Sequence, residues 1–364
     1  MSLRVVVDGL PITAESSLAV VVERLLTAWA ASDVADELHV VVGPRARLDV
    51  PSKVTVHEVG LGRISMLGRL RAQNLVVPKL CRSIGADAVL GVVPATVVAP
   101  LTCPRVVIAH DIRQDVLPQQ FSWTTRALRK VSWGLGWRQA GAVVTVSERT
   151  RSDLIRTRPW LEGRPVRVAH LGSDHVAAWA SNGTKEGGAI AFGQHGNKNV
   201  EMVIDAWALL HAAGESIALK VMGMPEDARR AAHAQVDRLG LDGVVTPLPW
   251  VSIDELHRCF ASAGLFVFPS DFEGFGLPAV EAMRLGIPLV ISPDPALLEV
   301  TDGHATVMEG WSAQALSDAV TSARRMTPEE LSIAHDRAAT FTWARMAANV
   351  RAAIVEAIDR RRER

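Results

Sequence analysis

The chain has 364 residues, more than a single hydrophobic core usually serves, so two domains are expected. Its 39 Lys and Arg residues balance its 39 Asp and Glu residues, and 48% of the residues are apolar. This composition is typical of an ordinary globular protein, and it suggests neither a surface that binds polyanions such as nucleic acid nor a disordered tail. The N-terminus lacks the pattern of a signal peptide, and no apolar stretch approaches the roughly 18 residues that cross a bilayer. The three cysteines are odd in number and far apart, which predicts neither a disulfide framework nor a metal site and favours a cytoplasmic setting.

The first half of the chain alternates short β-branched runs with helix-length segments. Continuous apolar strands separated by helices are typical of a parallel sheet that is covered on both faces. The sequence therefore predicts a doubly wound α/β domain. The expected strands are residues 4–7, 38–42, 53–58, 88–92, 105–109 and 142–146.

Two segments of this half combine cations with apolar residues. Residues 63–82 carry cations at positions 63, 69, 71, 79 and 82, and residues 121–138 carry three tryptophans and four cations. A basic amphipathic helix can lie on an anionic membrane surface, so peripheral membrane contact is one interpretation. The alternatives are a solvated helix face for the first segment and core packing of the tryptophans for the second.

Two polar residues follow the strand expected at residues 105–109. His110 and Asp111 are thereby placed at the carboxyl end of a strand, where open α/β sheets bind ligands. The alternative is that Asp111 caps a helix and that His110 has no role. Further along, Ser147 ends the next strand and is suited to cap the helix that follows.

The second half begins after a small, polar segment at residues 177–188, which is a credible hinge. A new strand is expected at residues 189–193, and two further strand–helix units at residues 217–239 and 244–263. Lys198 stands just before a helix, where a lysine is a well-placed point charge for a phosphate. The alternative is an ordinary surface lysine.

The most informative stretch is residues 268–291. An apolar run at residues 265–268 predicts a buried strand, a turn follows at Gly274 and Gly276, and a helix is expected from about Leu277 with Pro278 in its first turn. Such a junction presents backbone amides and the positive end of a helix dipole, which together can hold a phosphate.

Two carboxylates, Glu273 and Glu281, bracket this turn. If a nucleoside diphosphate binds at the turn, Glu281 can reach the ribose and Glu273 can reach a group beyond the phosphates. The alternative is that Glu281 only complements the helix dipole and that the glycines only permit a sharp turn.

Residues 273–281, with the sequence EGFGLPAVE, and residues 286–291, GIPLVI, resemble the E-x(7)-E signature of retaining GT-B glycosyltransferases of family 4, the glycosyl transferases group 1. The resemblance implies an α/β fold of the GT-B type, with two Rossmann-like domains facing each other across a cleft. Residues 1–175 would form the acceptor domain and residues 176–340 the donor domain, and residues 341–364 would form a helix that returns to the first domain.

The resemblance also implies roles for individual residues. Gln194 stands where the family often has an arginine, so one of the usual cations is missing. The implied catalytic residues are His110, Lys198 and Glu273. The implied donor-binding residues are Gly193, Lys198, Gly223, Trp250, Val251, Glu273, Gly274, Phe275, Gly276, Leu277 and Glu281. The loop that follows the first strand offers a candidate acceptor rim of Gly9, Thr13 and Ser16.

The expected activity is transfer of a hexose-type sugar, with retention, from a UDP-, GDP- or dTDP-sugar to a hydroxyl acceptor on a glycan, a lipid-linked glycan or a natural product. Polysaccharide biosynthesis is the expected setting, without a metal or other cofactor and without nucleic acid, in the cytoplasm or at the inner face of the membrane. Two alternatives remain open. One is a nucleotide-sugar epimerase or hydrolase of the same fold, and the other is a non-catalytic binder of sugar nucleotides.

Overall fold

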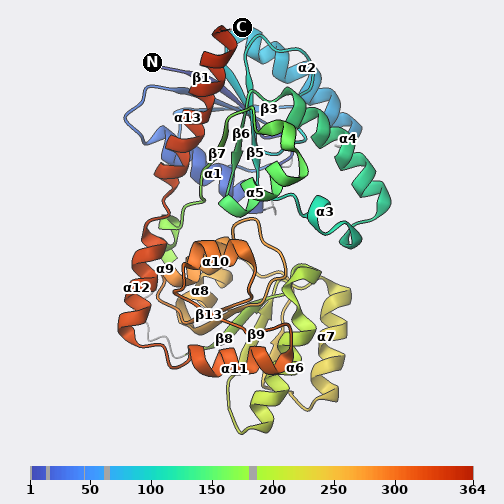
Figure 1. Cartoon of the computed structure of the whole chain (residues 1–364), viewed down its shortest axis with the longest axis vertical. Helices are drawn as coiled ribbons and strands as arrows, with labels where there is room; N and C mark the ends of the chain where they lie inside the picture. Colours follow the sequence, from blue (N-terminus) through green and yellow to red (C-terminus); the bar gives the residue numbers. More distant parts are fainter. Residues whose placement is uncertain (1, 14–16, 45, 61–65, 180–186, 364) are drawn as a thin grey trace. The chain divides into compact units, whose positions relative to one another are not determined.

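The computed structural model describes residues 2–13, 17–44, 46–60, 66–179 and 187–363 of the chain. They form two compact units (Figure 1). The first unit comprises Met1–Gly172 and Thr342–Arg364, and the second comprises Ser173–Phe341. Each unit has its own parallel sheet and its own hydrophobic core, so the expected α/β class with two Rossmann-like domains is confirmed.

The first unit contains a seven-stranded sheet in the order β3-β2-β1-β4-β5-β6-β7, in which every neighbouring pair is parallel. The chain winds outward from β1 in both directions, as in a doubly wound fold. The six strands expected from apolar runs are all present, with ends that differ by one residue at most. The strands are β1 (Arg4–Asp8), β2 (Glu37–Val42), β3 (Val54–Glu58), β4 (Ala88–Gly91), β5 (Arg105–Ala109), β6 (Ala142–Thr145) and β7 (Val166–Val168).

Helices cover this sheet, with α2 against β1 and α13 against β4 to β7. Ser147 caps α5 as expected, because its hydroxyl accepts a hydrogen bond from the amide of Thr150 at 3.0 Å. The helices of the first unit are α1 (Ser17–Ala30), α2 (Met66–Ile84), α3 (Arg113–Val116), α4 (Trp123–Gln139), α5 (Glu148–Thr157) and α13 (Trp343–Arg362), with the 3-10 turns η1 (Pro118–Gln120) and η2 (Pro159–Leu161).

An ion pair holds the C-terminal helix within the first unit. Arg351 of α13 donates from Nε to the buried Asp36 Oδ2 at 2.7 Å, and the indole of Trp29 donates to the same oxygen at 3.0 Å. Burial alone would raise the pKa of Asp36, but these hydrogen bonds lower it below its usual value. The last helix is therefore an integral part of the first unit.

The second unit contains a six-stranded parallel sheet in the order β10-β9-β8-β11-β12-β13. The strands are β8 (Gly187–Phe192), β9 (Leu219–Met222), β10 (Val245–Pro247), β11 (Ala263–Phe268), β12 (Leu289–Ile291) and β13 (Thr306–Val307). The helices are α6 (Val200–Ala212), α7 (Glu226–Arg238), α8 (Ile253–Ser262), α9 (Leu277–Arg284), α10 (Pro295–Thr301), α11 (Ala313–Ala323) and α12 (Pro328–Ala339), with the 3-10 turns η3 (Asp174–Trp179) and η4 (Gly196–Lys198).

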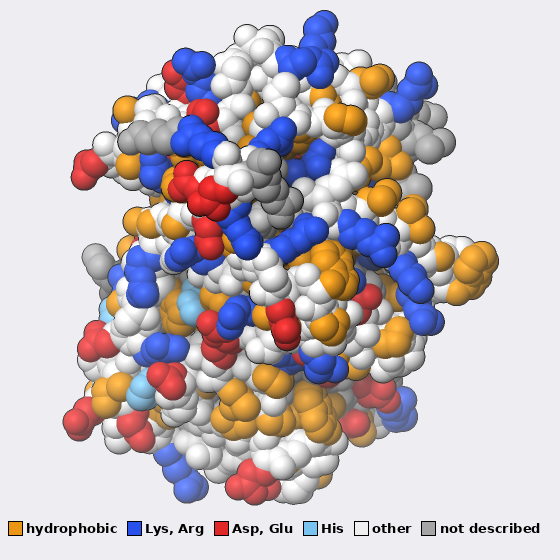
Figure 2. All heavy atoms as spheres, turned by 45° about the horizontal axis from the view of Figure 1, so that its top comes forward, with side chains coloured by type: hydrophobic (Ala, Val, Ile, Leu, Met, Phe, Trp, Pro, Cys, Tyr) orange, Lys and Arg blue, Asp and Glu red, His pale blue; other side chains and the backbone are white. Residues whose placement is uncertain are grey.

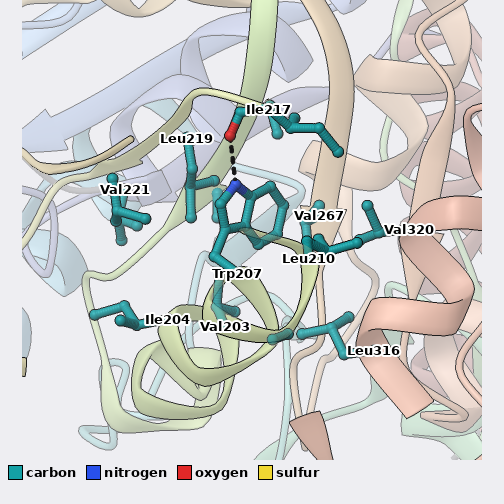
Figure 3. Close-up of a cluster of buried hydrophobic side chains, with 14 of the residues drawn as sticks. Val203, Ile204, Trp207, Leu210, Ile217, Leu219, Val221, Val267, Leu316 and Val320 are labelled. Carbon is teal, nitrogen blue, oxygen red and sulfur yellow. Dashed lines mark hydrogen bonds between the residues drawn. The ribbon is translucent and has the colours of Figure 1, made fainter. Parts of the chain in front are cut away.

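The core of the second unit is built around Trp207 of α6 (Figure 3). Its indole Nε1 donates to the carbonyl oxygen of Ile217 at 2.8 Å, so its single polar atom is satisfied although the ring is buried. Aliphatic side chains from the sheet and from α11 enclose the ring. This packing fixes α6, and with it the loop that leads into α6.

None of the helices in the described part of the chain is long and apolar enough to cross a membrane. The expected hinge at residues 177–188 falls largely on residues 180–186, which lie outside the described residues. Figure 2 shows Lys and Arg side chains, in blue, distributed among acidic and hydrophobic ones on the face that it presents.

Candidate functional site

The second sheet changes its winding direction between β8 and β11, which are hydrogen-bonded neighbours. In open α/β sheets, ligands bind beyond the carboxyl ends of the strands at such a switch point. Two loops leave the sheet here, one from β8 toward α6 and one from β11 toward α9. These loops carry most of the donor-binding residues expected from the sequence.

Lys198 and Glu273 meet at this point. The ammonium group of Lys198 donates a hydrogen bond to Glu273 Oε1, and the two side chains are only 10% and 15% exposed. The same ammonium lies 4.2 Å from the centre of the Phe268 ring, close enough for a cation–π contact. A lysine charge is therefore held at the end of β11, beside a carboxylate that balances it.

Two asparagines connect the loops that carry this pair. Asn197 Nδ2 donates to Ser270 Oγ at 2.8 Å and to the carbonyl oxygen of Phe272 at 3.0 Å. Asn199 has a left-handed backbone conformation, with φ of 52°, and its Nδ2 donates to the carbonyl oxygen of Pro269 at 2.8 Å. Neither asparagine was predicted from the sequence to belong to the site. Their signal is the string Asn-Lys-Asn between a strand and a helix, because asparagine tolerates this backbone conformation better than most residues.

Gly276 marks the turn before α9 and has φ of 89°. A Cβ atom there would lie 2.4 Å from Leu297 Cδ2, so the position requires glycine for both its backbone and its space. Pro278 lies in the first turn of α9, and Leu277 begins the helix, as expected. The ring of Phe275 points into the core against Phe341, with centroids 5.6 Å apart, so Phe275 can meet a ligand only through its backbone.

The second carboxylate of the motif has a partner that the sequence did not predict. Glu281 Oε1 lies 3.0 Å from His175 Nε2, and both side chains are buried. His175 belongs to η3, and its ring packs edge-on against Trp179, which in turn stacks on His257 at 4.1 Å. Glu281 is therefore fixed in position within α9 by a neighbouring segment of the second unit.

The remaining donor-binding candidates line the ends of β8, β9 and β10. A Cβ at Gly193 would lie 2.6 Å from Met224 Cγ, and a Cβ at Gly223, where φ is 79°, would lie 2.8 Å from Gln194 Cγ. The glycines thus let the loops after β8 and β9 pack closely. Trp250 is 61% exposed, which leaves its ring accessible, and Val251 is partly exposed beside it.

His110 lies in the first unit, at the end of β5. Its Nε2 is 3.0 Å from the carbonyl oxygen of Val92, which can only accept a hydrogen bond, so Nε2 carries the proton. Burial lowers the pKa of His110 and favours the neutral ring, in which Nδ1 is an acceptor. Asp111 Oδ1 accepts a hydrogen bond from the amide of Arg113 at 2.9 Å, at the start of α3.

Asp8, a buried carboxylate at the end of β1, was not predicted from the sequence to be part of a site. Asp8 Oδ2 accepts hydrogen bonds from Gln73 Nε2 at 2.8 Å and Thr96 Oγ1 at 2.7 Å. Its burial raises its pKa, although these hydrogen bonds oppose the shift. Its signal in the sequence is an acid directly after an apolar first strand, at the switch point of the first sheet.

The candidate acceptor rim is only partly described. Gly9 is buried, and a Cβ on it would lie 3.0 Å from Val40 Cγ2 and from the carbonyl oxygen of Val41. Thr13 is exposed, and Ser16 lies outside the described residues. Among the residues that the structure describes, no three His, Cys, Asp or Glu side chains are grouped so as to hold a metal ion.

Comparison with known proteins places the second unit in a family. The family model described as glycosyl transferases group 1 matches residues 188–324. The O-antigen chain mannosyltransferase B of Escherichia coli is 27% identical over 49% of this chain and 50% of its own length. The O-antigen chain mannosyltransferase RfbU of Salmonella typhimurium is 25% identical over 68% of each chain. The GDP-mannose-dependent α-(1-6)-phosphatidylinositol dimannoside mannosyltransferase of Mycobacterium tuberculosis is 31% identical over 43% of this chain and 40% of its own length.

Two solved structures share the fold over nearly the whole chain. HepE of Anabaena, determined in complex with UDP and glucose, is 18% identical, with a TM-score of 0.68 over 99% of this chain and 98% of that one. WaaG, described as a glycosyltransferase involved in lipopolysaccharide biosynthesis, is 17% identical, with a TM-score of 0.65 over 98% of this chain and 99% of that one. The family match thus covers residues 188–324 of the second unit, and the chain as a whole has the GT-B fold.

Proposed function

We propose that this protein transfers a hexose from a nucleoside-diphosphate sugar to a hydroxyl acceptor, with retention of configuration at the anomeric carbon. The observation that carries the proposal is the contact between Lys198 and Glu273 beside the start of α9. It brings a cation, a carboxylate and a helix N-terminus together at the switch point of the second sheet. These are groups that suit a diphosphate and the sugar attached to it.

In the proposed complex, the backbone of residues 274–277 and the ammonium of Lys198 bind the diphosphate. Glu273 then exchanges its contact with Lys198 for hydroxyl groups of the sugar, and Glu281 accepts hydrogen bonds from the ribose. The helix dipole and Lys198 stabilise the charge that develops on the departing diphosphate, so we expect no metal ion to be needed. His110 of the first unit is proposed to contact the donor sugar.

For retention, we propose that the acceptor hydroxyl attacks on the face from which the diphosphate leaves. The bond from the acceptor oxygen to the anomeric carbon forms as the bond to the diphosphate oxygen breaks, and the diphosphate takes the acceptor proton. Gln194 cannot supply the positive charge that an arginine would have at its position. Lys198 therefore contributes a larger share of the stabilisation of the departing diphosphate.

GDP-mannose is the first donor to test, because three relatives are named mannosyltransferases and one of these is named GDP-mannose-dependent. UDP- and dTDP-sugars complete the panel. A glycan or a lipid-linked glycan is the proposed acceptor class, since two of the relatives are named for the O-antigen chain.

We also propose that the protein contacts an anionic membrane surface peripherally, and the exposed side chains of helix α4 support this proposal. Three of its exposed apolar residues follow the i, i+3, i+7 spacing of one helix side, a fourth is its first residue, and exposed cations lie between them in the sequence. The apolar residues are Trp123, Leu128, Val131 and Leu135, and the cations include Arg126 and Lys130.

The proposed activity is tested by offering the nucleotide sugars with and without acceptor glycans, in buffer that contains EDTA. The proposal is supported if transfer requires the acceptor, continues in EDTA and gives a product with the same anomeric configuration as the donor sugar. Epimerised sugar released from the donor alone would instead indicate an epimerase of the same fold. Absence of turnover with every donor that binds would indicate a non-catalytic binder.

A further inference from the structure

The first unit contains a cavity of about 440 Å³ at the amino ends of the strands. His110 lies at the opposite, carboxyl end of β5. The cavity lies where β5 and β6 begin, and the last turns of α13 close one side of it. We call it the arginine pocket. Its lining includes the five arginines Arg105, Arg138, Arg164, Arg360 and Arg361.

No Asp or Glu lines the arginine pocket in the described part of the chain. The acids on the neighbouring turns of α13 face other partners. Glu356 lies 3.8 Å from Arg167, and Asp359 lies 3.9 Å from Arg362, and neither arginine lines the pocket. The positive charge of the pocket is therefore not balanced by its own walls.

The guanidinium groups are held in place by backbone carbonyl oxygens. Arg361 Nη2 donates to Leu101 at 3.0 Å, and Arg360 Nη2 donates to Gly163 at 3.1 Å. Arg164 Nη1 donates to the carbonyl oxygen of Ala140 at 2.6 Å. Neutral carbonyls orient these groups without cancelling their charge, so the cost of rearranging them to bind an anion is small.

Arg105 supplies an independent observation. Its side chain is buried, with the residue only 8% exposed, and one of its terminal nitrogens donates to the carbonyl oxygen of Ala99. Its Nε has no hydrogen-bond partner among the described residues, although it is buried. Burial lowers the pKa of Arg105, an effect that Cys103 opposes and that the nearby charge of Arg361 reinforces. A buried donor without an acceptor is costly, and an anion in the pocket would provide that acceptor.

We propose that the arginine pocket is a binding site for a phosphate-bearing anion. Guanidinium groups match the geometry of phosphate oxygens and bind them through two parallel hydrogen bonds. The volume is within the range of about 300 to 1,000 Å³ that is usual for small-molecule sites, so the pocket has room for a phosphate with an organic group attached. The site belongs to the first unit alone and is separate from the donor site around Lys198.

The phosphate could come from a soluble metabolite or from the headgroup of an anionic lipid. Both have the same chemistry at the pocket, and the experiment has one arm for each. Inorganic pyrophosphate is the soluble probe, measured by isothermal titration calorimetry. Vesicles of phosphatidylglycerol, compared with vesicles of phosphatidylcholine, are the lipid probe, measured by co-sedimentation.

The test variant combines Arg360→Gln with Arg361→Gln. Both side chains are exposed, so the change is expected to leave folding intact, which thermal unfolding checks. The matched control is Arg362→Gln, on the same turn but outside the pocket. Because pyrophosphate could also bind at the donor site, the Arg360→Gln/Arg361→Gln change is also measured in a Lys198→Ala background, in which the donor site is weakened.

We expect the Arg360/Arg361 variant to lose affinity for at least one probe by about tenfold or more, as charge-assisted hydrogen bonds to phosphate are lost. Arg362→Gln should retain that affinity, and the loss caused by the Arg360/Arg361 change should persist in the Lys198→Ala background. A loss confined to pyrophosphate identifies a soluble ligand, and a loss confined to phosphatidylglycerol vesicles identifies a lipid headgroup. If the Arg360/Arg361 variant binds both probes as wild type does, or if wild type binds neither at millimolar concentration, the pocket is not an anion site.

Discussion

The ammonium of Lys198 contacts the carboxylate of Glu273 across two loops and lies 4.2 Å above the Phe268 ring. Each member of the pair compensates the charge of the other. In the proposed mechanism, a diphosphate that approaches Lys198 offers a stronger partner, and Glu273 is then released toward the sugar. Under this proposal, the pair links binding of the leaving group to recognition of the sugar that is transferred.

Replacing Lys198 by alanine should lower kcat/KM by about a hundredfold to a thousandfold, the usual loss when one preorganised donor to a developing negative charge is removed. The effect should fall mainly on kcat, because the charge on the diphosphate grows in the transition state. Steady-state kinetics with the donor identified in the binding panel measure both constants. Lys220→Ala removes an exposed lysine on β9 of the same unit and serves as the control. Equal activity of the two variants would exclude a catalytic role for Lys198.

The Lys198→Ala/Glu273→Gln double variant tests whether the two side chains act as a pair. Lys198→Ala alone leaves a mostly buried carboxylate without its cation, so it should lower the free energy of unfolding by about 1 to 3 kcal/mol. The double variant should recover part of this stability, because glutamine carries no charge. Urea unfolding of the two single variants and the double variant gives the coupling energy. Strictly additive effects would show that the contact contributes nothing to stability.

Glu281→Gln should weaken binding of the donor nucleotide by about tenfold to a hundredfold, since a hydrogen bond to a charged group contributes about 1.5 to 3 kcal/mol. Glutamine can still contact His175, which limits the structural disturbance. Calorimetric titration with GDP and UDP measures the effect. Glu226→Gln is the control, because Glu226 forms only an exposed pair with Arg229 on α7. Unchanged nucleotide affinity in Glu281→Gln would remove the ribose contact from the proposed mechanism.

Gly276→Ala and Gly303→Ala form a matched pair of substitutions. Both glycines have positive φ, 89° and 81°, so each alanine costs about 1 to 2 kcal/mol of backbone strain. Only at Gly276 does the new Cβ collide, at 2.4 Å from Leu297 Cδ2, whereas nothing lies within 4 Å at Gly303. Gly276→Ala should therefore lower Tm more than Gly303→Ala does, and it should also reduce donor binding. Thermal unfolding with and without nucleotide tests both points. Equal losses of Tm in the two variants would contradict a steric clash at position 276.

The first unit should lose stability as the pH falls below about 6.5, the ordinary pKa of histidine. His39 Nδ1 lies 3.0 Å from His57 Nε2, and burial lowers the pKa of both rings. The charge of His57 lowers the pKa of His39 further. Glu37 raises this pKa and Arg4 lowers it, both by smaller amounts. Because the folded pKa values are lower than the unfolded ones, the unfolded chain binds more protons in this range and unfolding becomes easier.

Urea unfolding at pH 7.5 and pH 5.5 measures this effect, with His57→Gln as the test variant. The variant should show a smaller loss between the two pH values than wild type. His233→Gln changes an exposed histidine on α7 and should leave the loss as it is. A wild-type stability that does not change between these pH values would rule out this role of the histidine pair.

Membrane contact by α4 should depend on its exposed apolar residues. Trp123 is 77% exposed and Val131 is 64% exposed, so serine at both positions should cost little stability. The same change should lower binding to phosphatidylglycerol vesicles by about tenfold or more, since each buried apolar side chain contributes roughly 1.5 to 3 kcal/mol. Flotation measures this binding, and Ile333→Ser on α12, which is also exposed, is the control. Wild-type protein that stays with the soluble fraction in every lipid mixture would refute the membrane contact.

The sequence predicted the strands well, because strands buried on both faces are continuous apolar runs. The run at residues 142–146 became β6 (Ala142–Thr145), and the start of α9 at Leu277 followed from Gly276 and Pro278. These are local signals, in which the residues that cause an element also lie within it.

Contacts between distant segments could not be predicted in this way. His175 and Glu281 are 106 positions apart, and Asn197 and Ser270 are 73 positions apart. Neither pair has a pattern of spacing or composition, because their meeting depends on how β8 and β11 lie side by side in the sheet. The arginine pocket is hidden from the sequence for the same reason, since its cations come from four separate stretches of the chain.

The hydrogen bonds of Asn197 and Asn199 have a consequence for protein engineering. They connect the loop after β8 to the loop after β11, so the two loops form one structural unit. Grafting either loop alone from a relative would leave a buried amide facing a foreign backbone. A donor-specificity chimera of this protein should therefore exchange residues 194–199 and 269–276 together.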